Sequence, residues 1–321
     1  MDRMLAVAGT VLLALCSTSA WAQSFPNRTV RMVVHFPPGG PTDLVGRALG
    51  QRLSEAWKQS VVIENRPGAG GVLGVETVLR APADGHTLLF GTSGSLALAP
   101  ALQKLPYNVF TDLAPITLAV INPQILVVHP SLPVKSVQDL IRLAKSRPGQ
   151  INYASVGPGS PNHMGMELLK SMTGIDMVHI PYKGTAPAMA DVIAGQVSLL
   201  FNSMPAVLPH VQSGRLRGIA VGSAKRSPAA PDIPTVAESG VPGFQYTTWY
   251  ALLAPAATPK EVIARINADS VKALSQPDMV QSLASQGAEP APTSPEGLAK
   301  FMREEFEAWR KVIKAAGIRL E

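Results

Sequence analysis

Short runs of apolar, often β-branched residues alternate along this chain with longer segments in which apolar residues recur every three or four positions. The first pattern predicts strands and the second predicts amphipathic helices, and their alternation is typical of an α/β fold. Strands are predicted at 30–36, 61–64, 87–90, 125–129, 152–155, 177–180, 198–201, 217–221 and 250–254, and helices at 43–58, 72–80, 137–147, 164–172, 186–194 and 206–212. Each sheet is expected to be mainly parallel and flanked by helices.

The end of the chain differs, because residues 259–317 show only helical periodicity and close with a long helix predicted at 295–316. A helical tail cannot build its own sheet-centred domain, so we expect it to pack back on the first domain. This predicts a discontinuous first domain of residues 23–123 and 249–321 and a second domain of residues 124–248. The two chain crossings between them would form a hinge.

The N-terminus predicts export. A short basic start, an apolar run at 5–16 and the small residues Ala20 and Ala22 are typical of a signal peptide, here residues 1–22, cleaved after Ala22. The run is shorter than the roughly 20 apolar residues that span a bilayer, although an uncleaved anchor is the alternative. We expect a periplasmic, monomeric protein that keeps no cysteine once Cys16 is removed.

The charge excludes one class of partner. The formal net charge is +6, but lysine and arginine occur singly or in pairs and only 5% of residues are aromatic, so a nucleic-acid partner is not expected. A modest positive excess would instead help to attract small anions.

The strand predicted at 30–36 stops abruptly at the segment Pro37-Pro38-Gly39-Gly40-Pro41-Thr42-Asp43, and helical spacing begins at once. Such a junction turns free main-chain N–H groups toward one point. Glycine lets a ligand approach the main chain, and the helix N-terminus adds partial positive charge. The junction therefore suits a carboxylate or phosphate without any catalytic side chain.

A second junction of this kind follows the strand at 152–155, where Ser160 can cap a helix and Pro161 fits its first turn. Further polar, glycine-bearing or proline-bearing segments follow strands at 91–95, 181–185 and 202–205. In open α/β sheets ligands bind beyond the carboxyl ends of strands. A small dianion held between the two junctions, one in each domain, is the resulting hypothesis.

Catalytic, cofactor and metal motifs are thin. The segment 66–74 resembles a dinucleotide loop, but Leu73 stands where the third glycine belongs, so a tight turn is favoured. Ser93 misses the G-x-S-x-G pattern by one position, and the six histidines lack metal-ligand spacing, so no catalytic residue, cofactor or metal is expected. Structural roles are expected for His35, His129 and His179, whereas His163 could face the cleft or be structural.

Taken together, the chain resembles the extracytoplasmic substrate-binding proteins of tripartite tricarboxylate transporters, the Bug (TctC-like) family. The resemblance covers essentially the whole chain after residue 22 and is carried by residues 33–43, 64–71, 84–89, 152–155, 178–184 and 223–228. It implies a two-lobe periplasmic-binding-protein fold of type II. The two lobes would close on a small carboxylate and present it to a large and a small membrane subunit.

The resemblance also implies the ligand-binding residues. Main-chain N–H groups of the first junction would hold one carboxylate, at Phe36, Gly39, Gly40, Thr42 and Asp43. The second junction and its neighbours would complete the site, at Ser155, Gly157, Ser160, His163, Tyr182 and Lys183. Ser93 and Asn202, which follow two other predicted strands, are also expected to bind the ligand. Amino-acid-binding members are expected to carry an aspartate where this chain has Asn202, and a neutral amide cannot balance a desolvated ammonium. We therefore favour a non-amino mono- or dicarboxylate, aromatic acids included.

Two alternatives remain from the residues alone. A sensor of the same fold would present its closed form to a signalling receptor instead of a permease. A hydrolase would use Ser93 or Ser160 with His163.

Overall fold

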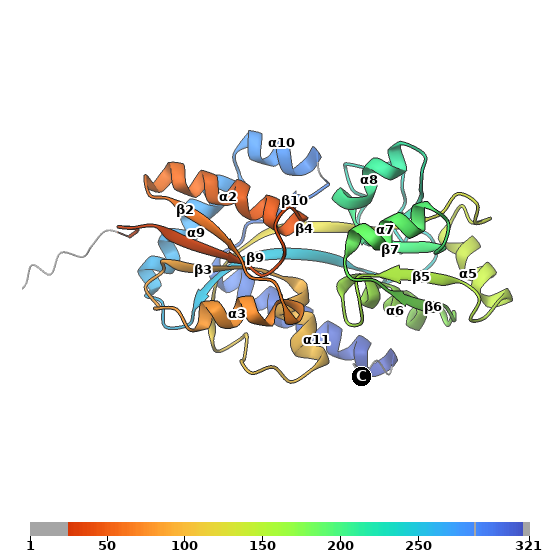
Figure 1. Ribbon diagram of the computed structural model, residues 1–321, viewed down its shortest axis with the longest axis horizontal. Helices are drawn as coiled ribbons and strands as arrows, with labels where there is room; N and C mark the ends of the chain where they lie inside the picture. The colour runs from red at the N-terminus through yellow and green to blue at the C-terminus, as the bar shows by residue number, and fades with distance from the viewer. Residues whose placement is uncertain (1–24, 286, 317–321) are drawn as a thin grey trace, which may run out of the picture.

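The computed structural model describes residues 25–285 and 287–316, so the predicted signal peptide lies outside the described residues. Two groups of strands and helices lie side by side and are joined by two long strands, β4 (Leu113–Val128) and β9 (Thr247–Pro255) (Figure 1). No helix between residues 25 and 316, as far as these are described, is long and apolar enough to cross a membrane.

The first group, at the left of Figure 1, is the first lobe, with its strands in the order β2-β1-β3-β9-β4. Its own strands are β1 (Val30–Val34), β2 (Val61–Asn65) and β3 (Thr87–Thr92), with the short β10 (Glu289–Pro290) beside β4. Its helices are α2 (Pro41–Trp57), η1 (Ala69–Gly71), α3 (Val72–Leu79), η2 (Gly94–Leu98), α4 (Ala99–Leu102), α9 (Lys260–Leu274) and α10 (Pro277–Ser285). Strands β1, β2 and β3 are parallel, as predicted, whereas β9 runs antiparallel to β3.

The second group is the second lobe, where the order continues as β4-β7-β5-β6 and β8 also pairs with β4. Its strands are β5 (Asn152–Ser155), β6 (Val178–Pro181), β7 (Leu199–Ser203) and β8 (Arg217–Val221). Its helices are α5 (Val137–Ser146), α6 (Pro161–Thr173), α7 (Thr185–Ile193) and α8 (Met204–Gln212). Strands β5, β6 and β7 are parallel, but β4 runs antiparallel to β7 and β8. The sheets are thus mixed rather than mainly parallel, because the strands that cross between lobes reverse direction.

Strand β4 is much longer than the strand predicted at 125–129. Its earlier half contains Pro115 and Pro123, which usually argue against a strand because proline donates no ladder hydrogen bond. In the structure Pro115 lies at a register shift against β9, and Pro123 is the last residue of β4 that pairs with β9 before Gln124 pairs with β7. This change of partner supports the predicted boundary between residues 123 and 124, which stays a prediction.

The final helix α11 (Pro295–Ala316) has the predicted bounds and runs beneath both lobes (Figure 1). Its buried Leu298, Met302 and Trp309 belong to one apolar core together with Val33 of the first lobe and Tyr153 of the second. One core therefore continues from lobe to lobe on this side of the sheets.

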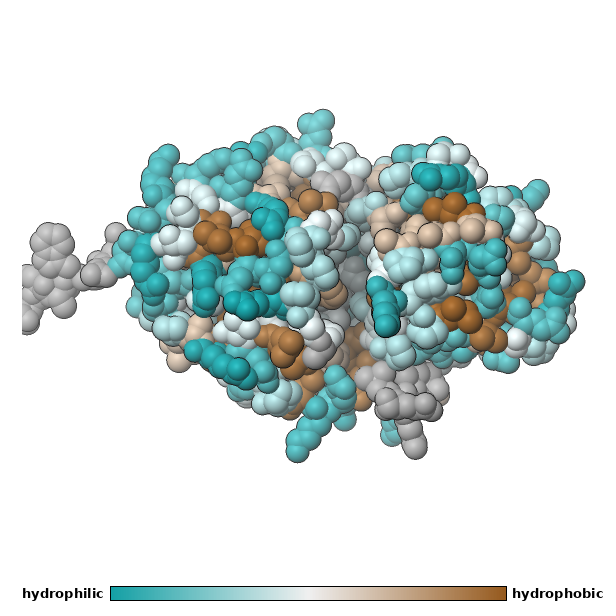
Figure 2. All heavy atoms as spheres, in the orientation of Figure 1, coloured by the Kyte–Doolittle hydropathy of each residue, from teal (hydrophilic) through white to brown (hydrophobic). Residues whose placement is uncertain are grey.

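The surface is hollowed between the two lobes, as Figure 2 shows in the orientation of Figure 1. The carboxyl ends of β1 and β3 in the first lobe and of β5, β6 and β7 in the second are followed by the predicted loop segments. These loops are the ones that sequence analysis selected.

Candidate ligand-binding site

The first junction joins β1 to α2. Gly40 is the N-cap of α2 with extended backbone (φ −80°, ψ 168°), and no side chain caps the helix. Within the described part of the chain, the N–H groups of Phe36, Gly40, Thr42 and Asp43 donate to no protein acceptor. Four main-chain donors of the predicted set are thus free to bind a ligand oxygen.

The Asp43 side chain holds this loop by hydrogen bonds. Its carboxylate accepts hydrogen bonds from the Gly39 N–H (2.9 Å), Arg47 Nε (2.8 Å) and Asn65 Nδ2 (2.8 Å). Although burial by itself would raise its pKa, these hydrogen bonds hold the pKa of Asp43 below its usual value. The Gly39 N–H, predicted as a ligand donor, is therefore already engaged, and sequence analysis missed Arg47 and Asn65 as its supports.

His35 lies beneath the first junction and is 1% exposed. Its Nε2 lies 3.2 Å from Thr92 Oγ1 at the end of β3. A Cβ atom on Gly71 or Gly74 would overlap the side chain of His35, so these glycines permit the close approach of α3. The segment at 66–74 is thus a tight turn packed on β1, as predicted.

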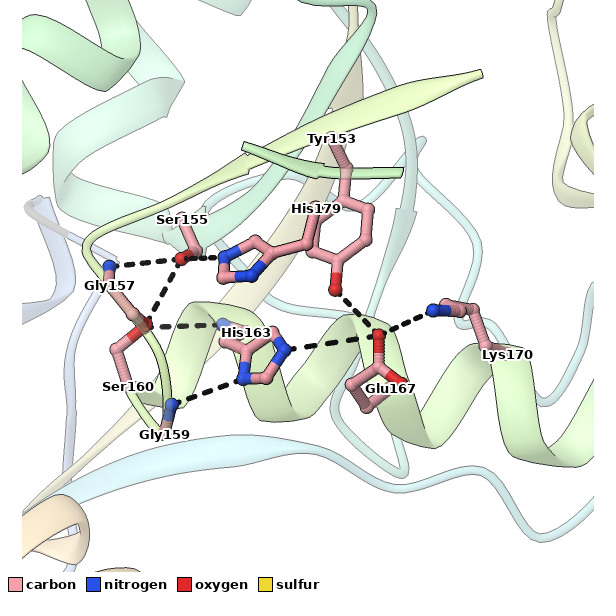
Figure 3. A network of polar contacts seen from close by, with 9 residues as sticks. All are labelled: Tyr153, Ser155, Gly157, Gly159, Ser160, His163, Glu167, Lys170 and His179. Carbon is pink, nitrogen blue, oxygen red and sulfur yellow. Dashed lines mark hydrogen bonds and ion pairs between the residues drawn. The ribbon is translucent and has the colours of Figure 1, made fainter. Parts of the chain in front are cut away.

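The second junction joins β5 to α6 and is held by two serines (Figure 3). Ser160 caps α6: its Oγ accepts a hydrogen bond from the His163 N–H and donates one to the Gly157 carbonyl at 2.6 Å. Ser155 Oγ accepts from the Gly157 N–H at 3.0 Å, and the Ser155 carbonyl accepts from the Tyr182 N–H. Both hydroxyls are therefore used to fix the backbone of residues 155–160.

The His163 ring contacts both the second junction and a neighbouring strand. Its Nδ1 accepts a hydrogen bond from the Gly159 N–H at 3.1 Å, and its ring stacks on His179 with centroids 4.1 Å apart. Since Ser160 Oγ donates to Gly157 and His163 Nδ1 is engaged by Gly159, the two side chains do not form a nucleophile and base.

A group of residues behind His163 was missed by sequence analysis (Figure 3). Glu167 Oε1 accepts hydrogen bonds from Tyr153 Oη (2.6 Å) and Lys170 Nζ (2.7 Å), and it lies 4.0 Å from His163 Nε2. The i, i+4 spacing of His163 and Glu167 could have revealed the pair, because the predicted cap at Ser160 places both residues on the helix even though the predicted range 164–172 leaves out His163.

The first lobe approaches the second junction at the end of β3. A Cβ atom built on Gly94, next to Ser93 and after β3, would lie 3.5 Å from Cγ of Pro161, the first residue of α6. Ser93 is 5% exposed at this point of contact between the lobes. The loop after β3 and the start of α6 thus meet across the hollow.

The other predicted site residues lie around the ends of β6 and β7. The Tyr182 hydroxyl donates to Asp191 Oδ2 at 2.7 Å, so it is turned to α7, whereas Lys183 is exposed. Asn202 Oδ1 accepts from the Ser203 N–H, and its buried Nδ2 has no hydrogen-bond partner among the described residues. A buried unpaired amide donor is costly, and a ligand oxygen would satisfy it.

Within residues 25–285 and 287–316, no group of three or more histidine, cysteine or acidic side chains could hold a metal ion. Two α/β lobes that are joined by paired strands, and that each carry a helix N-terminus beyond the carboxyl end of a parallel strand, define a two-lobe solute-binding protein.

The chain belongs to the family described as the tripartite tricarboxylate transporter family receptor, whose model matches residues 45–318. Among curated relatives, Protein BugT of Bordetella pertussis is 38% identical over 325 residues, which cover 100% of this chain and 99% of BugT. The family resemblance expected from the sequence is confirmed.

Two solved structures that the chain resembles carry carboxylates. A protein of R. palustris with adipate has 39% identity and a TM-score of 0.85, covering 92% of this chain and 99% of that one. MatC from Rhodopseudomonas palustris with bound malate has 34% identity and a TM-score of 0.80, covering 90% and 100%. The periplasmic binding protein BugD has 34% identity and a TM-score of 0.82, covering 92% and 100%. The family and these neighbours are solute receptors, so the chain is a binding protein and not an enzyme.

Proposed function

We propose that this protein captures a small non-amino mono- or dicarboxylate, aromatic acids included, between its two lobes and delivers it to a tripartite tricarboxylate-type transporter. The observation that carries the proposal is the pair of helix N-termini, of α2 in the first lobe and α6 in the second, on loops that follow parallel strands (Figure 1). Free N–H groups at Gly40, Thr42 and Asp43 would hold one carboxylate.

The charges around the site support a ligand without an ammonium group. Asn202 is a neutral amide, and the Asp43 carboxylate is already shared by Gly39, Arg47 and Asn65. An ammonium desolvated in a closing cleft would lack a partner, which costs several kcal/mol. The adipate and malate in the two similar structures are likewise carboxylates without an amino group.

Binding would work by a shift of populations. An open form exchanges with a closed one, and a ligand that contacts both lobes favours closure by the free energy of the contacts made only there. Closure also removes water from the carboxylates, which strengthens their hydrogen bonds to the loops.

A calorimetric and thermal-shift screen tests the ligand class. Adipate, malate, succinate, glutarate, benzoate and citrate are compared with two amino acids of matched length, aspartate for malate and succinate and glutamate for glutarate. Because ligand at about 100 times its Kd stabilises the folded state by about 2.7 kcal/mol, binding should be visible as a higher Tm. Tight binding of aspartate with none of succinate would overturn the proposed class.

The transport role has its own test. Proteoliposomes that contain the large and the small membrane subunit should take up a labelled carboxylate only when the loaded protein is present outside. Uptake that is equally fast without the protein would contradict delivery. Cell fractionation with N-terminal sequencing checks the proposed periplasmic location and cleavage after Ala22.

A further inference from the structure

We propose that His163 is a positioning residue for the ligand site, which holds the second junction in its binding geometry as a neutral hydrogen-bond acceptor without touching the ligand. The inference rests on the proposed function, since it concerns how the junction at 155–160 binds a carboxylate.

The first step is the bond between the loop and the ring. The Gly159 N–H donates a hydrogen bond to His163 Nδ1 at 3.1 Å. This bond fixes the orientation of the Gly159 peptide. Gly159 has a φ of +69°. Because glycine adopts positive and negative φ about equally readily, a hydrogen bond is needed to hold this one conformation. An acceptor at Nδ1 places the proton of neutral His163 on Nε2, which faces Glu167.

The second step is the support of the ring itself. His163 stacks on His179 (centroids 4.1 Å apart, planes at 21°), and His179 stacks on Tyr153 (5.1 Å, 20°) (Figure 3). His179 Nε2 lies 2.6 Å from Ser155 Oγ, the atom that accepts the Gly157 N–H. The two imidazoles therefore act on the same loop, one at Gly159 and the other through Ser155.

The third step is the charge around the rings. The ionisable groups that face them are Glu167 and Lys170 on α6, with the neutral phenol of Tyr153 on β5. Lys170 and Tyr153 both donate to Glu167, and these bonds outweigh burial and hold the pKa of Glu167 below its usual value. Lys170 therefore balances most of the charge of the Glu167 carboxylate, so Glu167 does not require a protonated His163 as its partner.

The histidines are consequently neutral at neutral pH. Burial lowers the pKa of His163 more than Glu167 raises it. Burial and then the neighbouring His163 lower the pKa of His179 to about 4. Protonation of Nδ1 in acid would replace an acceptor by a donor facing another donor, the Gly159 N–H, and the loop would lose its anchor.

The test compares three variants by calorimetry with the best carboxylate of the screen. His163→Leu removes the acceptor and leaves the Gly159 N–H unpaired, which should raise Kd by about tenfold. His163→Asn keeps an acceptor near the position of Nδ1 and should restore Kd to within about threefold of the wild type. His129→Leu is the matched control, because His129 follows β4 beside the start of β7, at the opposite end of the strands from the second junction, and its Nδ1 lies 2.7 Å from Ser131 Oγ.

A pH series separates positioning from a general structural role. Because the pKa of His163 is lowered from 6.5, wild-type affinity should fall only as the pH is taken below about 6.5, whereas His163→Asn should lose most of this fall and His129→Leu should keep it. In ¹⁵N spectra the wild-type ring should show the Nε2–H tautomer with unprotonated Nδ1. Unchanged affinity and pH profile in His163→Leu, with carboxylate binding intact in the wild type, would overturn the inference. A wild type that binds no carboxylate would instead refute the proposed function.

Discussion

Gly94 and Pro161 face each other across the two lobes, at a separation that leaves room for one methyl group: a Cβ on Gly94 would lie 3.5 Å from Pro161 Cγ. A branched side chain there would hold the lobes apart. We expect Gly94→Val to raise Kd for the carboxylate by about tenfold or more while Tm without ligand stays near the wild type, whereas Gly94→Ala should bind almost normally. Calorimetry of both variants is the measurement, and equal affinities would contradict contact of the lobes at this point.

Gly40 offers a clean test of main-chain binding at the first junction. Its backbone is extended (φ −80°), so valine is tolerated there, and the nearest atom to an added Cβ is the Pro37 carbonyl oxygen at 3.8 Å. Gly40→Val should therefore fold normally, but its side chain should block the approach of a ligand and raise Kd by about tenfold or more. Gly39 is less suitable, because its φ of +81° would strain any other residue. Affinity like that of the wild type, measured by calorimetry beside Gly40→Ala, would refute the placement of the carboxylate.

Asn202 is expected to set the preference against amino acids. Asn202→Asp would place a negative charge in a buried position, and its repulsion of the ligand carboxylates should weaken dicarboxylate binding by about tenfold or more. The ratio of the aspartate and succinate Kd values should move toward aspartate, because an ammonium would then find a partner. Asn202→Ala controls for the loss of the amide, and a ratio that is the same in all three proteins would exclude this role.

The folded protein should lose stability in mild acid because of His35. Burial lowers the pKa of His35 to about 4, with a partial offset from the main chain of Phe90, whereas an unfolded chain has the ordinary value of about 6.5. Below pH 6.5 the unfolded state binds a proton that the folded state does not, so the free energy of unfolding should fall until about pH 4 and then level off for this group. Between pH 7 and about pH 4, His35 alone should lower the free energy of unfolding by roughly 3 kcal/mol.

Urea unfolding at pH 7, 5.5 and 4.5 measures this loss. His35→Asn should be less stable at pH 7, since the side chain fills the space beside Gly71 and Gly74, but its stability should depend less steeply on pH. The same slope in both proteins would assign the acid sensitivity to other groups.

Local chemistry made much of the fold predictable. Ser160 caps the helix that its position predicted and accepts from the His163 N–H, and Ser136 caps α5 in the same way by accepting from the Asp139 N–H. The strands predicted at 30–36 and 152–155 are present as the parallel strands β1 and β5, and both junctions lie beyond the carboxyl ends of those strands. Each of these features depends on a few neighbouring residues, which a single sequence contains in full.

The features that depend on distant partners were harder to predict. The length of β4 comes from pairing with β9 and β7, and it tolerates Pro115 and Pro123 only where the register shifts or the partner changes. The short π-helix η2 lies between β3 and α4, and nothing in its sequence separates it from a loop. The orientation of His163 depends on His179 and Tyr153, which come from two other elements. Sequence could name His163 but could not tell which way its ring would turn.

Trp249 lies on crossing strand β9, and its indole N–H donates to Glu305 of α11 at 3.1 Å. Trp249 is completely buried. Burial raises the pKa of Glu305, and the hydrogen bond from the indole partly offsets this rise. If the paired strands β4 and β9 twist when the ligand binds, the surroundings of this indole change. The chain therefore contains its own fluorescent probe, and the kinetics of capture can be followed by emission alone, without attaching a dye.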